Sequence, residues 1–349
     1  LEDKNPKSVN EISSLGEFGL IKHLTENIKL QNKSSKLGVG DDAAVLEFKD
    51  KQVLVTTDML VEGVHFDLLY TPFKHLGYKA VVVNLSDIYA MNGNPTQVTV
   101  SLAVSNRMSI EALEELYEGM LLACEIYGVD LVGGDTTSSL SGLIISITAV
   151  GEAEKEDIVY RNGAKENDLI CVSGDLGGAF MGLQLLEREK QVYNEAPTVQ
   201  PDFAGHDYVL ERQLKPEPRK DVIDMFRELG IKPTSMIDVS DGLSSDLSHL
   251  CKQSKVGCTI YEDKIPIDFT VVSLANDMSL DSTVCALNGG EDYELLFTIS
   301  LDDYNKIKES KRVAVIGHVT NSEGDYQIVD KSEVVHKLVA QGWDSIAKE

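Results

Sequence analysis

The sequence of 349 residues contains no CxxC pair, and its five cysteines lie mostly in apolar stretches. We therefore expect reduced, buried thiols and no zinc site, as is usual for a cytoplasmic protein. No run approaches the roughly 18 apolar residues that a membrane span needs. Residues 1–10 are polar and carry no apolar core of a signal peptide. These absences predict a cytoplasmic protein with no membrane partner.

Positive charge is scarce in this sequence. There are 32 lysines and arginines against 57 aspartates and glutamates, which gives a formal net charge of −25 at pH 7. The phosphates of nucleic acid and of anionic membranes repel so acidic a chain, so we expect no nucleic-acid partner. Most acidic residues are expected to keep the surface solvated, while a subset binds cations. Net charge does not separate the two groups, but position does.

The common nucleotide-binding motifs are also missing. There is no GxxxxGK[ST] segment, which excludes a P-loop enzyme, and no HRD or DFG, which excludes a protein kinase. The segment Gly174-Asp175-Leu176-Gly177-Gly178 follows a predicted strand but lacks the GxGxxG spacing of a dinucleotide loop. We interpret it as the turn that starts a helix.

The pattern of apolar residues predicts two α/β halves, a first domain at 1–151 and a second at 152–349, separated by the charged segment 152–157. Segment 191–218 is polar and proline-bearing, and we expect a long excursion there, either a lid or a loop. The expected helices are 17–30, 78–91, 110–124, a helix through 186, 219–229 and 241–254. The expected strands are 53–57, 97–104, 129–132, 143–150, 169–172, 293–299 and 313–318.

Five acidic clusters lie where a strand ends or a turn begins. Magnesium is usually held by a few carboxylates together with substrate phosphates, and aspartate places its oxygens close to the backbone. Neighbouring glycines let the main chain approach a polyphosphate, and hydroxyl groups can add contacts. The clusters therefore point to a magnesium and phosphate site. They are Gly38–Ala44, Thr56-Thr57-Asp58, Asn84–Asp87, Gly133–Thr137 and Asp238–Gly242.

Each cluster also has a purely structural explanation. Asp41-Asp42 after a glycine is typical of a turn or a helix N-cap, and Asp241-Gly242 is a plausible cap as well. Asp87 differs because it lies inside a predicted helix, on the same face as Asn84. One such cluster carries little weight. Five in a single chain are hard to explain as five independent turns.

Taken together and in order, these segments resemble the thiamine-monophosphate kinase family, in the superfamily of aminoimidazole ribonucleotide synthetase. The resemblance extends from Gly16-Glu17-Phe18 to Gly342-Trp343, which is almost the whole chain. It is carried by segments 38–44, 57–66, 79–87, 133–137, 161–164, 237–243 and 289–294.

The resemblance implies a two-domain α/β (α+β) protein with a ferredoxin-like N-terminal sheet domain and a larger α/β C-terminal domain. It implies a homodimer in which the N-terminal sheets pair, with the N-terminal domain binding ATP and magnesium and the C-terminal domain completing the site. Several Mg²⁺ ions would be bound by Asp42, Asp58, Asp87, Asp135, Asp238 and Asp241, beside Thr56 and Thr57, whereas Asp41 matches less well. ATP would contact Gly134, Asp135, Arg161 and Ser240, with Tyr117 as a weaker candidate.

Three further positions correspond to the family's contacts with thiamine monophosphate. His65 is otherwise a packed loop residue, and Glu291 is otherwise a cap at a strand end. Trp343, the only tryptophan, either anchors the C-terminal tail or stacks on a cationic thiamine ring. Likewise, Arg161 either bridges two phosphate oxygens of ATP or is a surface arginine.

The expected activity is ATP-dependent phosphorylation of thiamine monophosphate to thiamine diphosphate. Both reactants are anions, so magnesium would neutralise phosphate charge and align donor with acceptor. The acceptor is already an ionised phosphate oxygen, so the hypothesis is direct in-line transfer without a general base or a phosphoenzyme. The alternatives are another ATP-using synthetase of the superfamily and a non-enzymatic acidic metal-binding module. A selenophosphate-type enzyme would want a reactive cysteine near the N-terminus, yet the first cysteine is Cys124.

Overall fold

The computed structural model describes residues 23–37, 45–46 and 52–339. The chain packs as two compact units. The first comprises residues 1–84 and 95–152, and the second comprises residues 85–94 and 153–349. The short segment 85–94 belongs to the second unit because its end bonds there: the Val159 N–H donates to the Met91 carbonyl at 3.2 Å, and the Asn92 amide donates to the Asp157 carbonyl at 2.9 Å.

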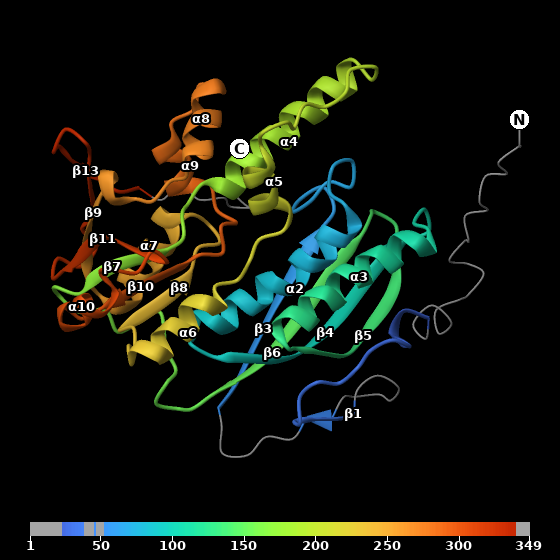
Figure 1. Ribbon diagram of the computed structural model, residues 1–349, viewed down its shortest axis with the longest axis horizontal. Helices are drawn as coiled ribbons and strands as arrows, with labels where there is room; N and C mark the ends of the chain where they lie inside the picture. The colour runs from blue at the N-terminus through green and yellow to red at the C-terminus, as the bar shows by residue number, and fades with distance from the viewer. Residues whose placement is uncertain (1–22, 38–44, 47–51, 340–349) are drawn as a thin grey trace, which may run out of the picture. The chain divides into compact units, whose positions relative to one another are not determined.

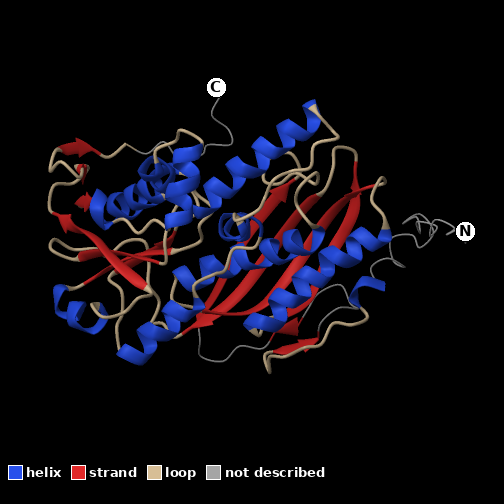
Figure 2. Ribbon diagram, turned by 45° about the horizontal axis from the view of Figure 1, so that its top comes forward, coloured by secondary structure: helices blue, strands red, loops and turns tan. Residues whose placement is uncertain are grey.

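The first unit contains a four-stranded sheet with the order β3-β6-β4-β5. Helices α2 (Phe73–Ala90) and α3 (Ile110–Tyr127) lie across one face of this sheet (Figures 1 and 2). A small separate pair, β1 (Ser35–Leu37) and β2 (Val45–Leu46), runs antiparallel. The strands of the main sheet are β3 (Gln52–Val61), β4 (Asn94–Ser105), β5 (Asp130–Ser139) and β6 (Ile144–Ala153).

Helix α3 shows why these residues fold as they do. The Ser109 side chain caps its start by accepting from the Ala112 N–H, and Gly128 ends it in the left-handed conformation at φ 67°. Its apolar residues recur at helical spacing and face the sheet, where Leu113, Leu116 and Met120 are fully buried. The helix predicted at 110–124 is thus confirmed, with one more turn at its end.

The second unit is built on a seven-stranded sheet with the order β13-β12-β9-β11-β7-β10-β8. Its neighbours are antiparallel except for the parallel pair β12 and β9. The strands are β7 (Leu169–Ser173), β8 (Ser235–Asp238), β9 (Gly257–Tyr261), β10 (Leu295–Ile299), β11 (Val313–Thr320), β12 (Tyr326–Val329) and β13 (Val335–Lys337).

Helices flank the sheet of the second unit, and α7 contributes Leu243, Leu247 and Leu250 to its main apolar core. The second unit also contains the short 3₁₀ turns η2 (Glu262–Lys264) and η3 (Leu301–Asp303). The helices are α4 (Gly178–Glu195), α5 (Asp207–Leu214), α6 (Lys220–Leu229), α7 (Leu243–Ser254), α8 (Phe269–Asp277), α9 (Ser282–Asn288) and α10 (Tyr304–Ile307).

Two predictions about local structure need correction. The described part of the helix predicted at 17–30 is helical only over residues 23–25 and then turns. Segment 191–218, expected as a lid or a loop, is only partly a loop, because it contains the end of α4 and all of α5, which pack against each other (Figure 1). The prediction of reduced thiols is confirmed, since all five cysteines are buried and unbridged. Within the described residues, no helix is long and apolar enough to span a membrane.

Candidate active site

Asp58 in the first unit lies on β3 and is fixed through its backbone. Its N–H donates to the Asn84 side-chain oxygen at 2.9 Å. The Asn84 amide in turn donates to the Ala80 carbonyl at 3.0 Å, one turn earlier on α2. Asn84 is almost completely buried, so this bridge locks the strand to the helix. The structure thus brings together Asp58 and Asn84, two members of the acidic segments.

The two threonines before Asp58 differ in orientation. Successive side chains of a strand point to opposite faces, so Thr56 shares the face of Asp58 whereas Thr57 does not. The Thr57 hydroxyl donates to the Ile147 carbonyl of β6 at 3.1 Å, and it accepts from the Thr148 hydroxyl at 3.1 Å. The structure therefore does not bring Thr57 together with Asp58.

His65 lies in the turn that follows β3. Its ring Nδ1 accepts from the Val61 N–H at 3.1 Å, which leaves the proton of the neutral ring on Nε2. The nearby Glu62 carboxylate accepts from the Leu143 N–H at 2.7 Å and ties the turn to the residue just before β6. These bonds fix the histidine in the half-buried turn.

Gly134 and Asp135 lie on β5, an edge strand paired in parallel with β4. A Cβ at Gly134 would be 1.8 Å from the Val100 carbonyl oxygen, so the strand pairing itself requires a glycine there. Asp135 is exposed. Tyr117 is only 7% exposed, and burial raises its pKa to about 12. Tyr117 is therefore mainly a core residue, with little of its ring accessible to an adenine.

In the second unit, the end of β8 carries a buried carboxylate. Asp238 is 3% exposed, and its Oδ2 accepts from the Ser86 hydroxyl at 2.7 Å. Ser86 precedes Asp87 on α2, so this bond places Asp87 one residue from a contact of Asp238. Sequence reasoning assigned no role to Ser86, although its place between Asn84 and Asp87 was a usable signal.

A second buried carboxyl group of this unit, that of Asp246 on α7, organises the turn after β8. Its Oδ2 accepts from the Ser240 N–H at 3.2 Å and from the Asp241 N–H at 3.1 Å. Burial, together with Asp238 and Asp241, raises the pKa of Asp246 to about 8. Carboxyl groups are thus crowded in this turn, and a bound cation would favour their ionised forms.

The segment at 289–294 packs directly on this turn. The Glu291 N–H donates to the Ser240 carbonyl at 2.8 Å, and the Tyr293 N–H donates to the Val239 carbonyl at 2.9 Å. The Glu291 carboxylate accepts from the Gln213 amide of α5 at 3.0 Å. The structure therefore joins Glu291 to Ser240, whereas the sequence analysis assigned the two residues to different ligands.

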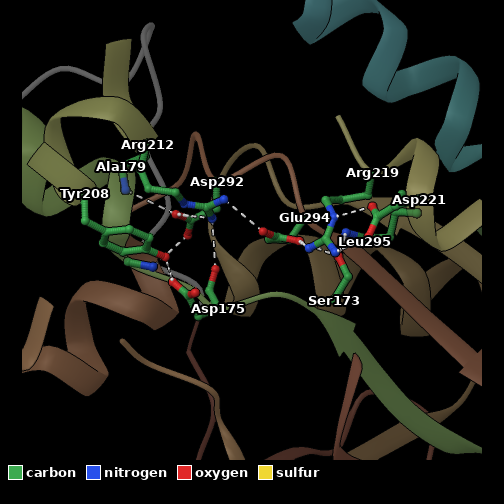
Figure 3. Close-up of polar contacts among 11 residues, drawn as sticks. Ser173, Asp175, Ala179, Tyr208, Arg212, Arg219, Asp221, Asp292, Glu294 and Leu295 are labelled. Atoms are coloured by element: carbon green, nitrogen blue, oxygen red, sulfur yellow. Dashed lines mark hydrogen bonds and ion pairs between the residues drawn. The ribbon is translucent and has the colours of Figure 1, made fainter. Parts of the chain in front are cut away.

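Two carboxylates beside Glu291 are buried in a network of ion pairs (Figure 3). Arg212 of α5 donates through Nη1 to Glu294 at 2.9 Å and through Nη2 to Asp292 at 3.4 Å. The side chains of Asp292 and Glu294 are 0% and 2% exposed. Burial raises the pKa of Asp292 to about 6, although Arg212 acts in the opposite direction.

A second arginine completes the network. Arg219 donates to the other oxygen of Glu294 and also to Asp221 at 2.9 Å, and the Ser173 hydroxyl donates to Glu294 as well (Figure 3). Glu294 is thus bonded to two guanidinium groups and a hydroxyl. Removing one partner of such a buried set is strongly destabilising.

Asp292 also explains the glycine-rich turn before α4. Its carboxylate accepts from the Gly177 N–H at 2.8 Å and from the Ala179 N–H at 3.3 Å. An anion at a helix N-terminus is stabilised by the free N–H groups there. Because the chain supplies that anion itself, the turn is a helix start, as the sequence indicated, and not a dinucleotide loop.

The remaining predicted residues are less informative. Arg161 is exposed, as a surface arginine would be, and Asp42 and Trp343 lie outside the described residues. Within the described ranges, no three histidine, cysteine or acidic side chains form a group that could hold a metal ion unaided. Sequence reasoning missed Arg212, Gln213 and Arg219, because contacts with residues about 80 positions away leave no local signal. It also missed Asp246, whose bonds reach only five and six residues back along the chain.

The chain is similar in sequence and in structure to known proteins. Residues 40–153 match the family model described as "AIR synthase related protein, N-terminal domain". The chain is 37% identical to thiamine-monophosphate kinase of Bacillus subtilis, over 84% of this chain and 87% of that protein.

Two solved structures are similar as well. The thiamine-monophosphate kinase of Stenotrophomonas maltophilia K279a is 31% identical, with a TM-score of 0.75 over 90% of this chain and 95% of that one. AaThiL complexed with AMPPCP and TMP is 32% identical, with a TM-score of 0.74 over 96% and 98%. The predicted mixed α/β fold class, like that of aminoimidazole ribonucleotide synthetase, is therefore confirmed.

Proposed function

This chain belongs to the thiamine-monophosphate kinase family, and we propose that it transfers the terminal phosphoryl group of ATP to thiamine monophosphate with the help of magnesium. The observation that carries the proposal is the similarity, over nearly the full length of both chains, to AaThiL complexed with AMPPCP and TMP. AMPPCP is an analogue of ATP. The similar structure therefore contains an analogue of the proposed phosphoryl donor together with TMP.

The acidic residues support a role in holding Mg²⁺. Asp238 is almost fully buried at the end of β8, and Asp241 adds a second carboxyl group in the turn that follows. Such a donor set suits Mg²⁺, which takes oxygen ligands from a few carboxylates, waters and substrate phosphates. The proposed ligands are Asp42, Asp58, Asp87, Asp135, Asp238 and Asp241, with Thr56 beside them. The bound ions would neutralise phosphate charge in the transition state.

The chain's own residues position the reactants. Glu291 is proposed to face the cationic part of thiamine, together with His65 and Trp343. Gly134, Asp135, Arg161 and Ser240 are proposed to contact ATP. No general base is needed, because the acceptor phosphate is already ionised near neutral pH. We therefore propose direct in-line transfer, and a stable phosphoenzyme formed from ATP alone would contradict it.

The decisive test is a substrate panel. Purified protein is mixed with ATP, Mg²⁺ and one of several phosphorylated acceptors, and ADP release is measured. We expect turnover with thiamine monophosphate and little with the others. Preference for a different acceptor would favour another ATP-using synthetase of the superfamily, and no turnover at all would favour a metal-binding module.

Asp87→Asn tests the role of the acidic residues in the same assay. We expect kcat to fall by roughly a hundredfold or more, since an electrostatic contact to transferring phosphate is lost, while the melting temperature stays within a few degrees. Asp277→Asn, at the exposed end of α8, is the matched control and should leave kcat unchanged. Near-normal turnover by Asp87→Asn would count against the magnesium model.

A further inference from the structure

Helix α5 makes side-chain contacts with all three acidic residues of segment 289–294 through two consecutive residues. Arg212 donates to Asp292 and Glu294, at 3.4 and 2.9 Å, and Gln213 donates to Glu291 at 3.0 Å. The Arg212 side chain is 14% exposed, and Gln213 is 5% exposed. Figure 3 shows Arg212 reaching between Asp292 and Glu294.

The backbone of this segment has a conformation that side chains disfavour. Glu291 and Tyr293 have φ values of 57° and 52°, in the left-handed region that non-glycine residues rarely adopt. Gly290, just before them, has φ 70°. Such a conformation persists only where surrounding contacts determine it, and it is frequent at ligand-binding sites. The contacts from α5 are of that kind.

The held segment is also bonded to the acidic turn after β8. Besides the two N–H donors of Glu291 and Tyr293, the Val239 N–H donates to the Glu294 carbonyl at 2.7 Å. Helix α5 therefore fixes the position of segment 289–294, and through these backbone bonds the segment is held against the turn that carries Asp241. A shift of α5 would be expected to move the acceptor contact first, because Gln213 bonds the Glu291 carboxylate itself.

We propose that Arg212 and Gln213 are positioning residues for acceptor recognition. Arg212 fixes the segment through its two buried carboxylates, and Gln213 orients the Glu291 carboxylate toward the acceptor. An amide is suited to this task because it donates a hydrogen bond without adding a positive charge that would offset the carboxylate. The inference rests on the proposed function, in which Glu291 contacts thiamine monophosphate.

Gln213→Met is the first test, because methionine keeps the length of the side chain and removes the donor. We expect KM for thiamine monophosphate to rise roughly tenfold, the usual order for losing a hydrogen bond to a charged group. KM for ATP and kcat should change by less than about twofold. Glu211→Ala, on the exposed side of the same helix, is the matched control and should change none of the three.

A double-mutant cycle separates positioning from general loosening of the fold. If Gln213 acts through Glu291, then Gln213→Met adds little to the KM increase already caused by Glu291→Gln. Arg212→Lys keeps the positive charge but loses the planar guanidinium group that bonds both carboxylates. It should raise KM for thiamine monophosphate by a smaller factor than Gln213→Met does. If Gln213→Met does not fold, Gln213→Asn replaces it in the test. Asparagine is one methylene shorter, so its amide no longer reaches the Glu291 carboxylate.

Two results would overturn the inference: additive effects in the cycle, or equal increases in KM for ATP and for the acceptor. Its failure is distinct from failure of the proposed function. If the wild-type protein used another phosphorylated acceptor, the function would be wrong, and the cycle would be measured with that acceptor. If the wild-type protein used thiamine monophosphate and the cycle were additive, only the positioning role would be wrong.

Discussion

At the scale of single residues, Arg212 is the side chain on which the most buried charge depends. Asp292 and Glu294 are almost fully desolvated, and both bond to its guanidinium group. A buried carboxylate that has lost its cation is costly, whereas the intact set is close to neutral in its effect on stability. Arg212 is thus indispensable once the acids are present, even though the network as a whole need not add stability.

Arg212→Met should lower the free energy of unfolding by about 3–5 kcal/mol at pH 8 and by clearly less at pH 5. The pKa of Asp292 is already raised to about 6, and losing the arginine raises it further. A raised carboxyl pKa in the folded state gives stability that is present at low pH and lost as pH rises through that pKa. Urea unfolding of both proteins at the two pH values measures the difference.

The control for this experiment is Arg227→Met, which removes an exposed ion pair to Asp224 on α6. Exposed pairs contribute less than about 1 kcal/mol, so this variant should show a small change that is equal at both pH values. If the loss in Arg212→Met did not depend on pH, the two carboxylates would not be the reason for it.

At the scale of helices and strands, long periodic segments were predictable and short polar ones were not. Helix α3 follows from apolar residues at helical spacing between a serine cap and a glycine. Helix α5 has only eight residues, of which only Val209 and Gln213 are buried. Its sequence therefore has too few periodic apolar residues to predict a helix. Its position is set by packing on α4 and by ion pairs with residues about 80 positions away.

The candidate site likewise has parts that the sequence predicts and parts that it does not. The acidic segments were visible because aspartates next to glycines and hydroxyls are unusual in that number. The orientation of Thr57 and the bond between Gln213 and Glu291 depend on strand pairing and on long-range contacts. No single-sequence pattern contains that information, since contacts of this kind arise only when the elements pack.

Strand β5 offers a test of why Gly134 is glycine. Gly134→Ala would bring a methyl group against the Val100 carbonyl of β4, so we expect a loss of about 1–3 kcal/mol in unfolding free energy. Gly133→Ala is the matched control, because nothing lies within 4 Å of a Cβ there. Thermal unfolding measures both. Equal stability, combined with a raised KM for ATP in Gly134→Ala alone, would instead assign this glycine to nucleotide binding.

At the scale of the whole molecule, the acidic composition opposes self-association, whereas the exposed apolar residues of β3 favour it. A net charge of −25 keeps copies of the chain apart, and association therefore needs a local apolar surface. Edge strand β3 has such a surface at alternate positions, where Val53, Val55 and Met59 are 43%, 64% and 55% exposed. We propose that a second copy of the chain covers this face, which would give the homodimer that the resemblance to the family implies.

Val55→Lys combined with Met59→Lys should convert the proposed homodimer to a monomer, because two buried ammonium groups would remain unpaired at the contact. Sedimentation at micromolar concentration measures the mass of both proteins. Leu140→Lys is the control: Leu140 is fully exposed in the turn between β5 and β6, so its substitution should leave the mass unchanged. A wild-type protein that sediments as a monomer would refute the dimer directly. A double variant that stays dimeric would show that the copies associate through another surface, and β3 would then need a different explanation for its apolar face.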